Sequence, residues 1–133
     1  MSRKRILIID DHPLFREGLK SIFERNTRFK VAGEAGRGDE GVQLAKKLQP
    51  DLVLLDLSLP DKSGIQMTRE ILAVLPNTKV LIISMHSKIN YITEAFQAGA
   101  SGYLVKESAS ERLLDALEMV SKGEYFLDSS ISR

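Results

Sequence analysis

Cysteine is absent from this chain, which excludes disulfide bonds and thiolate metal sites and fits a reducing cytoplasm. Net charge is nearly absent too: 19 basic and 18 acidic residues leave +1, which predicts no general attraction to nucleic acid. No apolar run approaches the roughly 20 residues that span a bilayer. The first run, residues 6–9, is also far shorter than the ~7–15 apolar residues of a signal peptide. We therefore expect a cytoplasmic globular domain without a membrane segment.

Apolar runs and amphipathic segments alternate five times along the chain. Runs of about four apolar residues between turn signals are typical of strands buried on both faces. Strict alternation with helices predicts an α/β fold of parallel strands, with helices on both faces of the sheet. Residues 123–133 show no period and are predicted to be a tail or the start of a linker after a domain of residues 1–122. Strands are expected at residues 5–10, 29–35, 51–56, 79–84 and 102–106, and helices at about 12–23, 39–49, 65–75, 88–98 and 108–122.

Four of the predicted strands end on polar residues that suit phosphate or metal chemistry. They are Asp10 and Asp11 at the end of the first strand, Asp56 at the end of the third, Ser84 at the end of the fourth and Lys106 at the end of the fifth. In an open α/β sheet, ligands bind outside the carboxyl ends of the strands, so these groups should share one rim. Carboxylates bind Mg²⁺, and an aspartate can act as a nucleophile toward phosphorus. The set therefore indicates a Mg²⁺-assisted phosphoryl acceptor.

Each of these residues also has an ordinary structural explanation. An aspartate or serine after a strand often caps the next helix, and a lysine is usually a solvated charge. Their joint occurrence favours the functional interpretation, because separate structural roles would not place members of one reaction set at four strand ends.

Two segments resemble a known family. Residues 10–19 (DDHPLFREGL) and 55–64 (LDLSLPDKSG) are similar to receiver domains of two-component response regulators, in particular the NarL/FixJ-type subfamily with LuxR-type output. The resemblance implies a flavodoxin-like (CheY-like) doubly wound sheet with strand order 2-1-3-4-5. The site residues that it implies are the phosphoacceptor Asp56, the Mg²⁺ ligands Asp10, Asp11, Asp56 and the Ser58 backbone carbonyl, the switch hydroxyl of Ser84, the phosphate-binding Lys106, and the switch aromatic Tyr103.

Further positions refine this comparison. Many family members have a proline after the lysine, with a cis peptide before it, whereas this chain has Glu107, which leaves the isomer of the Lys106–Glu107 peptide open. In the subfamily, the residues two beyond the acceptor and two beyond the switch hydroxyl tune dephosphorylation. These are Ser58 and His86, so we predict that they affect the lifetime of the phosphorylated state. A solvated loop histidine is the alternative for His86.

Other functions remain as alternatives. Residues 36–41 form a G-x-G-x-x-G motif between a predicted strand and helix, and Asp56 follows at the distance of a ribose-binding acid. Against dinucleotide binding, Asp39 and Glu40 put negative charge where a pyrophosphate would bind. An aspartyl-phosphate phosphatase would need a second aspartate at Ser58, so we expect self-catalysed phosphotransfer and slow hydrolysis rather than a metabolic enzyme. A receiver that is never phosphorylated, serving only as an interaction module, is the last alternative.

The resemblance also implies partners. A sensor histidine kinase would donate the phosphoryl group, and homodimerisation on phosphorylation is expected. DNA would be contacted only through a helix-turn-helix output domain outside this chain, for control of transcription. No membrane partner is expected.

Overall fold

The computed structural model describes residues 3–129 and 131 of the chain. The ten predicted elements are present, and their ends lie within about one residue of the predicted ones. Every peptide bond in the described residues is trans, which settles the isomer of Lys106–Glu107. In chain order the elements are β1 Lys4–Ile9, α1 Pro13–Phe23, β2 Phe29–Ala35, α2 Gly38–Leu48, β3 Leu52–Asp56, α3 Gly64–Val74, β4 Lys79–Ser84, α4 Ile89–Gln97, β5 Gly102–Val105, the 3₁₀ turn η1 Lys106–Ser108, α5 Ala109–Ser121 and β6 Phe126–Leu127.

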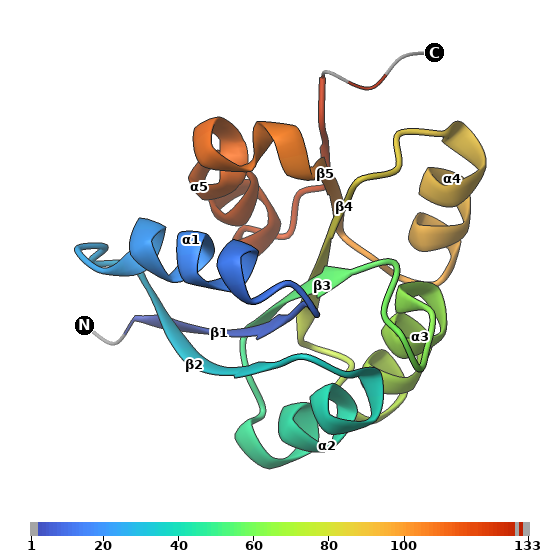
Figure 1. Cartoon of the computed structure of the whole chain (residues 1–133), viewed down its shortest axis with the longest axis horizontal. Coiled ribbons are helices and arrows are strands. Elements are labelled where there is room, and N and C mark those ends of the chain that lie inside the picture. Colours follow the sequence, from blue (N-terminus) through green and yellow to red (C-terminus); the bar gives the residue numbers. More distant parts are fainter. Residues whose placement is uncertain (1–2, 130, 132–133) are drawn as a thin grey trace.

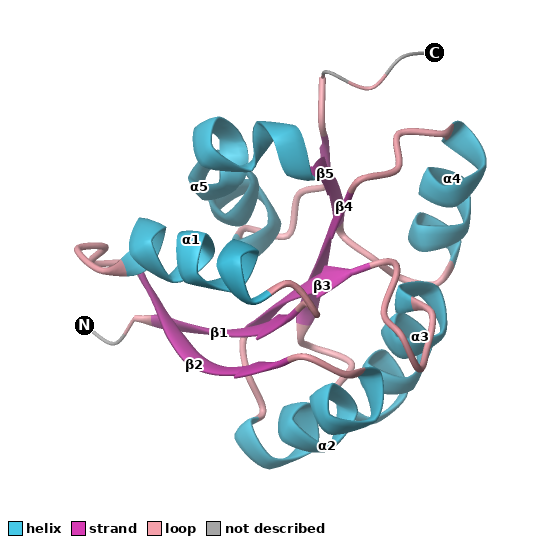
Figure 2. Cartoon of the chain, in the orientation of Figure 1, coloured by secondary structure: helices cyan, strands magenta, loops and turns pink. Residues whose placement is uncertain are grey.

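The strands of the described residues form one parallel sheet of six, with the order β2-β1-β3-β4-β5-β6. The predicted order 2-1-3-4-5 is therefore confirmed, and β6 extends it at the edge beside β5. Strand β1 pairs with β3, β3 with β4, and β4 with β5. The four strands that end on the predicted site residues thus lie side by side (Figure 2).

Each face of the sheet carries its own layer of core. Successive strand residues point to opposite faces, so Leu7 and Ile9 pack toward α2, α3 and α4, whereas Ile6 and Ile8 pack toward α1 and α5. Figure 1 shows the same division, with α1 and α5 on one side of the sheet and the other three helices across it. Burial on both faces explains why these strands are continuous apolar runs. Among the described residues, no helix has the length and apolarity that crossing a membrane requires.

Residues 123–129, which are predicted to be a tail or the start of a linker, pack against the sheet in the structure. Strand β6 pairs with β5, and the Phe126 side chain is buried. The Asp128 carboxylate, in a residue only 1% exposed, accepts a hydrogen bond from the N–H of Val105 at 3.0 Å. A two-residue edge strand is too short to produce a hydrophobic period, so the sequence carried no signal for it. Residues 130, 132 and 133 of the predicted tail lie outside the described residues.

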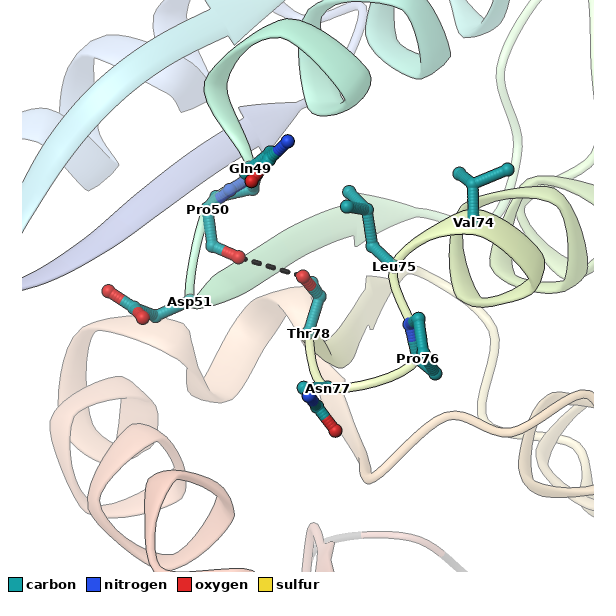
Figure 3. Close-up of a pocket in the computed structure, with 8 residues that line it drawn as sticks. All are labelled: Gln49, Pro50, Asp51, Val74, Leu75, Pro76, Asn77 and Thr78. Atoms are coloured by element: carbon teal, nitrogen blue, oxygen red, sulfur yellow. Dashed lines mark hydrogen bonds between the residues drawn. The ribbon is translucent and has the colours of Figure 1, made fainter.

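The end of α3 and the loops that lead into β3 and β4 line a pocket at the end of the sheet away from the predicted site (Figure 3). The Thr78 hydroxyl donates a hydrogen bond to the Pro50 carbonyl at 2.8 Å. The Asp51 carboxylate accepts the N–H of Arg5, also at 2.8 Å. These bonds tie together the loops that begin the strands, so we assign this pocket a structural role.

Candidate functional site

The carboxyl ends of β1, β3 and β5 bring two buried carboxylates and a lysine into contact. Lys106 Nζ lies 2.9 Å from Asp10 Oδ2 and 3.3 Å from Asp56 Oδ2. Asp10 and Asp56 are 2% and 4% exposed. The same ammonium lies 4.5 Å from the ring centroid of Phe15, a cation–π contact that helps to hold it over the site. Lys106, which follows β5, therefore contacts two predicted site residues at the ends of two other strands.

Hydrogen bonds within the loops orient the two carboxylates. Asp10 Oδ1 accepts the N–H of His12 at 2.7 Å, and Asp56 Oδ1 accepts the N–H of Ser58 at 3.0 Å. The loop after β3 then returns close to Asp56 at Gly64, where an added Cβ would lie 2.7 Å from the Asp56 carbonyl oxygen. A glycine at this position allows the backbone to approach so closely.

His12, which was not among the predicted site residues, also lies in this cluster. Its Nδ1 is 3.1 Å from Asp10 Oδ1, 3.2 Å from Asp11 Oδ1 and 3.8 Å from Asp56 Oδ2. It is also 3.0 Å from Lys106 Nζ. Sequence reasoning placed His12 at the start of a helix, as the structure does. Its position directly after two aspartates was the available signal, but the direction of its ring depends on the loop geometry.

The cluster of Asp10, Asp11, His12 and Asp56 fits a divalent cation. One ligand-type atom from each of these residues lies within 4.8 Å of the others. The buried Asp11 Oδ1 has no hydrogen-bond partner among the described residues, and leaving such an oxygen unpaired is unfavourable. A cation would pair with this oxygen and reduce the repulsion between the carboxylates. Carboxylate oxygens together with water are the ligands that Mg²⁺ prefers.

The ionisation of Asp56 depends on this environment. Burial raises its pKa above the ordinary value of a carboxyl group, the hydrogen bond from Ser58 N–H opposes that rise, and the charge of Asp10 adds to it. Lys106 acts to lower the pKa. The carboxylate is therefore less favourable here than in water, and added positive charge would stabilise the ionised, nucleophilic form.

The predicted switch residues Ser84 and Tyr103 are fully buried and hold the loop between β4 and α4. Ser84 Oγ accepts the N–H of His86 at 3.0 Å, and the Tyr103 hydroxyl donates to the His86 carbonyl at 2.9 Å. His86 Nε2 lies 3.2 Å from Ser58 Oγ, and its ring packs on Tyr91 with centroids 4.6 Å apart. His86 therefore contacts both predicted switch residues, Ser84 and Tyr103, and it also contacts Ser58, the other residue predicted to affect dephosphorylation.

The glycine-rich motif of residues 36–41 leads into the N-terminus of α2, which another part of the chain already caps. Asp61 Oδ1 accepts the N–H of Gly38 at 2.7 Å, and Oδ2 accepts that of Asp39 at 2.9 Å. These backbone hydrogen bonds lower the pKa of Asp61 to about 2. A carboxylate therefore occupies the position that a pyrophosphate would need, which argues against dinucleotide binding.

Known proteins share this fold and sequence pattern. The family model of the response regulator receiver domain matches residues 6–118. This chain belongs to that family. The receiver domain is 37% identical over 128 residues to the transcriptional regulatory protein DegU of Brevibacillus brevis, covering 96% of this chain and 54% of that protein. It is 35% identical over 127 residues to the nitrate/nitrite response regulator protein NarL of Escherichia coli K12, covering 96% of this chain and 59% of that protein.

Solved structures agree. A two-component response regulator of the LuxR family from Aurantimonas sp. SI85-9A1 has a TM-score of 0.92 and 37% identity, covering 98% of this chain and 93% of that chain. The signal receiver domain of NarL from Mycobacterium tuberculosis has a TM-score of 0.88 and 34% identity, covering 93% of this chain and all of that one. The predicted subfamily and the flavodoxin-like fold are therefore confirmed. The receiver domain spans little more than half the length of the curated relatives described here.

Proposed function

We propose that this receiver domain is a phosphorylation-dependent switch of a two-component system, with Asp56 as its phosphoacceptor. The observation that carries the proposal is the contact of Asp56 Oδ2 with the Lys106 ammonium at 3.3 Å, inside a cluster of carboxylates that fits a cation. A buried nucleophile and a fixed positive charge stand together where a phosphoryl group would be transferred.

The phosphoryl group would come from a phosphohistidine of a sensor histidine kinase. An oxygen of Asp56 forms the new P–O bond while the P–N bond breaks, and the electron pair of that bond stays on the imidazole nitrogen of the donor. Lys106 offsets charge on the phosphoryl oxygens. Asp10, Asp11, Asp56 and the Ser58 carbonyl would hold Mg²⁺, which supplies further charge neutralisation.

Water would later hydrolyse the acyl phosphate and restore the Asp56 carboxylate. This step should be slow, because Ser58 stands where an aspartyl-phosphate phosphatase has its acid–base aspartate. The contact between Ser58 Oγ and His86 Nε2 at 3.2 Å supports a joint role in setting that rate. We therefore expect different decay rates of phosphorylated wild type and His86→Ala, and equal rates would contradict this role.

The switch would act through the loop between β4 and α4. The Ser84 hydroxyl accepts a hydrogen bond from His86 and retains its own proton, which it can donate to a phosphoryl oxygen. A shift of Ser84 toward that oxygen would disturb His86, which Tyr103 also holds. The phosphoryl group would thus bias the position of α4, as a two-state switch requires.

The output would lie outside this chain. Since the chain covers 54% and 59% of two transcriptional regulators, we propose residues 1–122 as the phosphoacceptor unit and residues 123–133 as the start of the path toward a LuxR-type DNA-binding domain. Phosphorylation would promote homodimerisation and control transcription in the cytoplasm, with DNA contacted by that output domain.

Intact-mass spectrometry after incubation with acetyl phosphate tests the proposal. We expect a single adduct of about 80 Da on wild type with Mg²⁺, and its loss without Mg²⁺ or in Asp56→Asn, because the acyl phosphate needs this carboxylate. Asp115→Asn, which changes an exposed aspartate on α5, should form the adduct normally. An adduct on folded Asp56→Asn, or none on wild type, would refute the role of Asp56.

A further inference from the structure

The imidazole of His12 lies among the carboxylates that would hold a cation. Three carboxylate oxygens, from Asp10, Asp11 and Asp56, lie 3.1–3.8 Å from its Nδ1. The backbone of His12 is held beside the cluster, since its N–H donates to Asp10 Oδ1 at 2.7 Å and the next residue, Pro13, begins α1. The ring nitrogen lies within the cluster, although the side chain as a whole is 59% exposed.

The contacts of His12 Nδ1 conflict with one another. Toward the carboxylates of Asp10 and Asp11, the nitrogen would have to donate a proton. Toward the Lys106 ammonium, 3.0 Å away, it would have to accept one. One ring nitrogen cannot do both, and Asp11 Oδ1 has no hydrogen-bond partner in the described part of the chain. A metal ion bound beside Nδ1 would accept its lone pair and the negative charge of the carboxylates together. Because two cations repel each other, the ion would replace the Lys106 ammonium next to this nitrogen, which removes the conflict.

We propose that His12 is a metal ligand that makes this site selective for imidazole-binding cations such as Zn²⁺ over Mg²⁺. This inference deepens the proposed function, since it concerns the same cation site. Mg²⁺ is bound through oxygen and gains little from an imidazole, whereas Zn²⁺ is bound well by neutral imidazole nitrogen. His12 Nδ1 adds one nitrogen to a set of carboxylate oxygens. Zn²⁺ therefore uses His12, and Mg²⁺ binds through the oxygens without it.

Metal titrations by calorimetry test the selectivity directly, with no reliance on phosphorylation. We compare wild type, His12→Ala and His12→Asn, the last because asparagine is also well suited to the position before a helix. Both variants should bind Zn²⁺ roughly tenfold or more weakly, while the Mg²⁺ affinity stays within about twofold. Asp11→Asn is the matched control, because loss of a shared oxygen ligand should weaken both metals.

The nitrogen resonances of the histidine rings report ligation itself. In wild type, Zn²⁺ should shift the Nδ1 signal of His12, assigned by its loss in His12→Ala, and Mg²⁺ should leave that signal nearly in place. Equal losses of Zn²⁺ and Mg²⁺ affinity in the His12 variants, unchanged Zn²⁺ affinity, or an unshifted Nδ1 signal would each overturn the inference. So would wild type that binds neither metal.

The two proposals fail in different ways. Selective Zn²⁺ binding without any acetyl phosphate adduct would support the role of His12 and refute the phosphoryl switch. An Mg²⁺-dependent adduct on Asp56 without Zn²⁺ selectivity would do the reverse.

Discussion

Replacement of Asp128 by alanine should destabilise the receiver domain measurably, because this carboxylate holds β6 to β5, the strand that directly precedes Lys106. Asp128 is 1% exposed, and its Oδ2 accepts the N–H of Val105 at 3.0 Å. Its own N–H donates to the Tyr103 carbonyl, also at 3.0 Å. The side chain therefore supplies the acceptor for a buried N–H at the end of β5.

The loss of unfolding free energy in Asp128→Ala depends on the Val105 N–H, which would lose its acceptor. Without the carboxylate, the Val105 N–H lacks this partner, and an unsatisfied buried donor costs about 1–3 kcal/mol. The ion pair with Arg112, at 3.9 Å and with the arginine 42% exposed, adds little. For a domain of this size, 1 kcal/mol corresponds to roughly 3–5 °C in melting temperature. Asp128→Asn keeps an acceptor oxygen and should lose less.

Urea unfolding of wild type, Asp128→Ala and Asp128→Asn measures this difference, and amide exchange at Val105 locates it. Asp115→Ala, at an exposed aspartate of α5, is the control and should stay within about 0.5 kcal/mol of wild type. If Asp128→Ala unfolds like this control and the Val105 amide exchanges no faster than in wild type, the carboxylate does not hold β6 and our reasoning is wrong.

Three further changes test other parts of the fold. Glu34→Gln should lower the unfolding free energy near pH 7 by under ~1 kcal/mol, because the hydrogen bond from Lys20 lowers the pKa of this part-exposed Glu34 carboxyl. That contribution is present above the ordinary carboxyl pKa and disappears as the pH falls through the lowered one. The difference in unfolding free energy between wild type and Glu34→Gln should therefore be measurable in urea curves near pH 7 and vanish in acid. Gly64→Ala should cost roughly 1–3 kcal/mol in the same assay, since its Cβ would press on backbone at 2.7 Å. Asp61→Ala should speed amide exchange at Gly38, because the wild-type Asp61 carboxylate accepts the Gly38 N–H. Unchanged exchange would contradict the capping role of Asp61.

The predicted strands and helices agreed with the structure because burial on both faces makes strands such as β1 and β3 continuous apolar runs. Helix ends carried equally local signals, as with Pro13 at the start of α1. Strand β6 lacked any such signal. It is held by pairing with β5 and by the Asp128 carboxylate, and neither contact leaves a pattern within two residues of sequence.

Some contacts of the candidate site could likewise be predicted from the sequence, and others could not. Asp10, Asp56 and Lys106 could be predicted to meet, because each stands at the carboxyl end of a strand and parallel strands share one rim. The capping of α2 by Asp61 could not, since it joins residues 22 and 23 positions apart through a loop. The direction of the His12 ring was equally hidden from the sequence.

The sequence by itself determined the fold class, the strand order implied by the family, and the set of groups at the rim, because hydrophobic patterns and strand ends are local properties of the chain. The tertiary structure decided what those groups contact: that Lys106 lies between Asp10 and Asp56, that His86 contacts both Ser58 and Ser84, and that His12 points into the acidic cluster. Such contacts depend on loop geometry and side-chain rotamers, which packing between distant segments selects and which no local pattern of residues encodes.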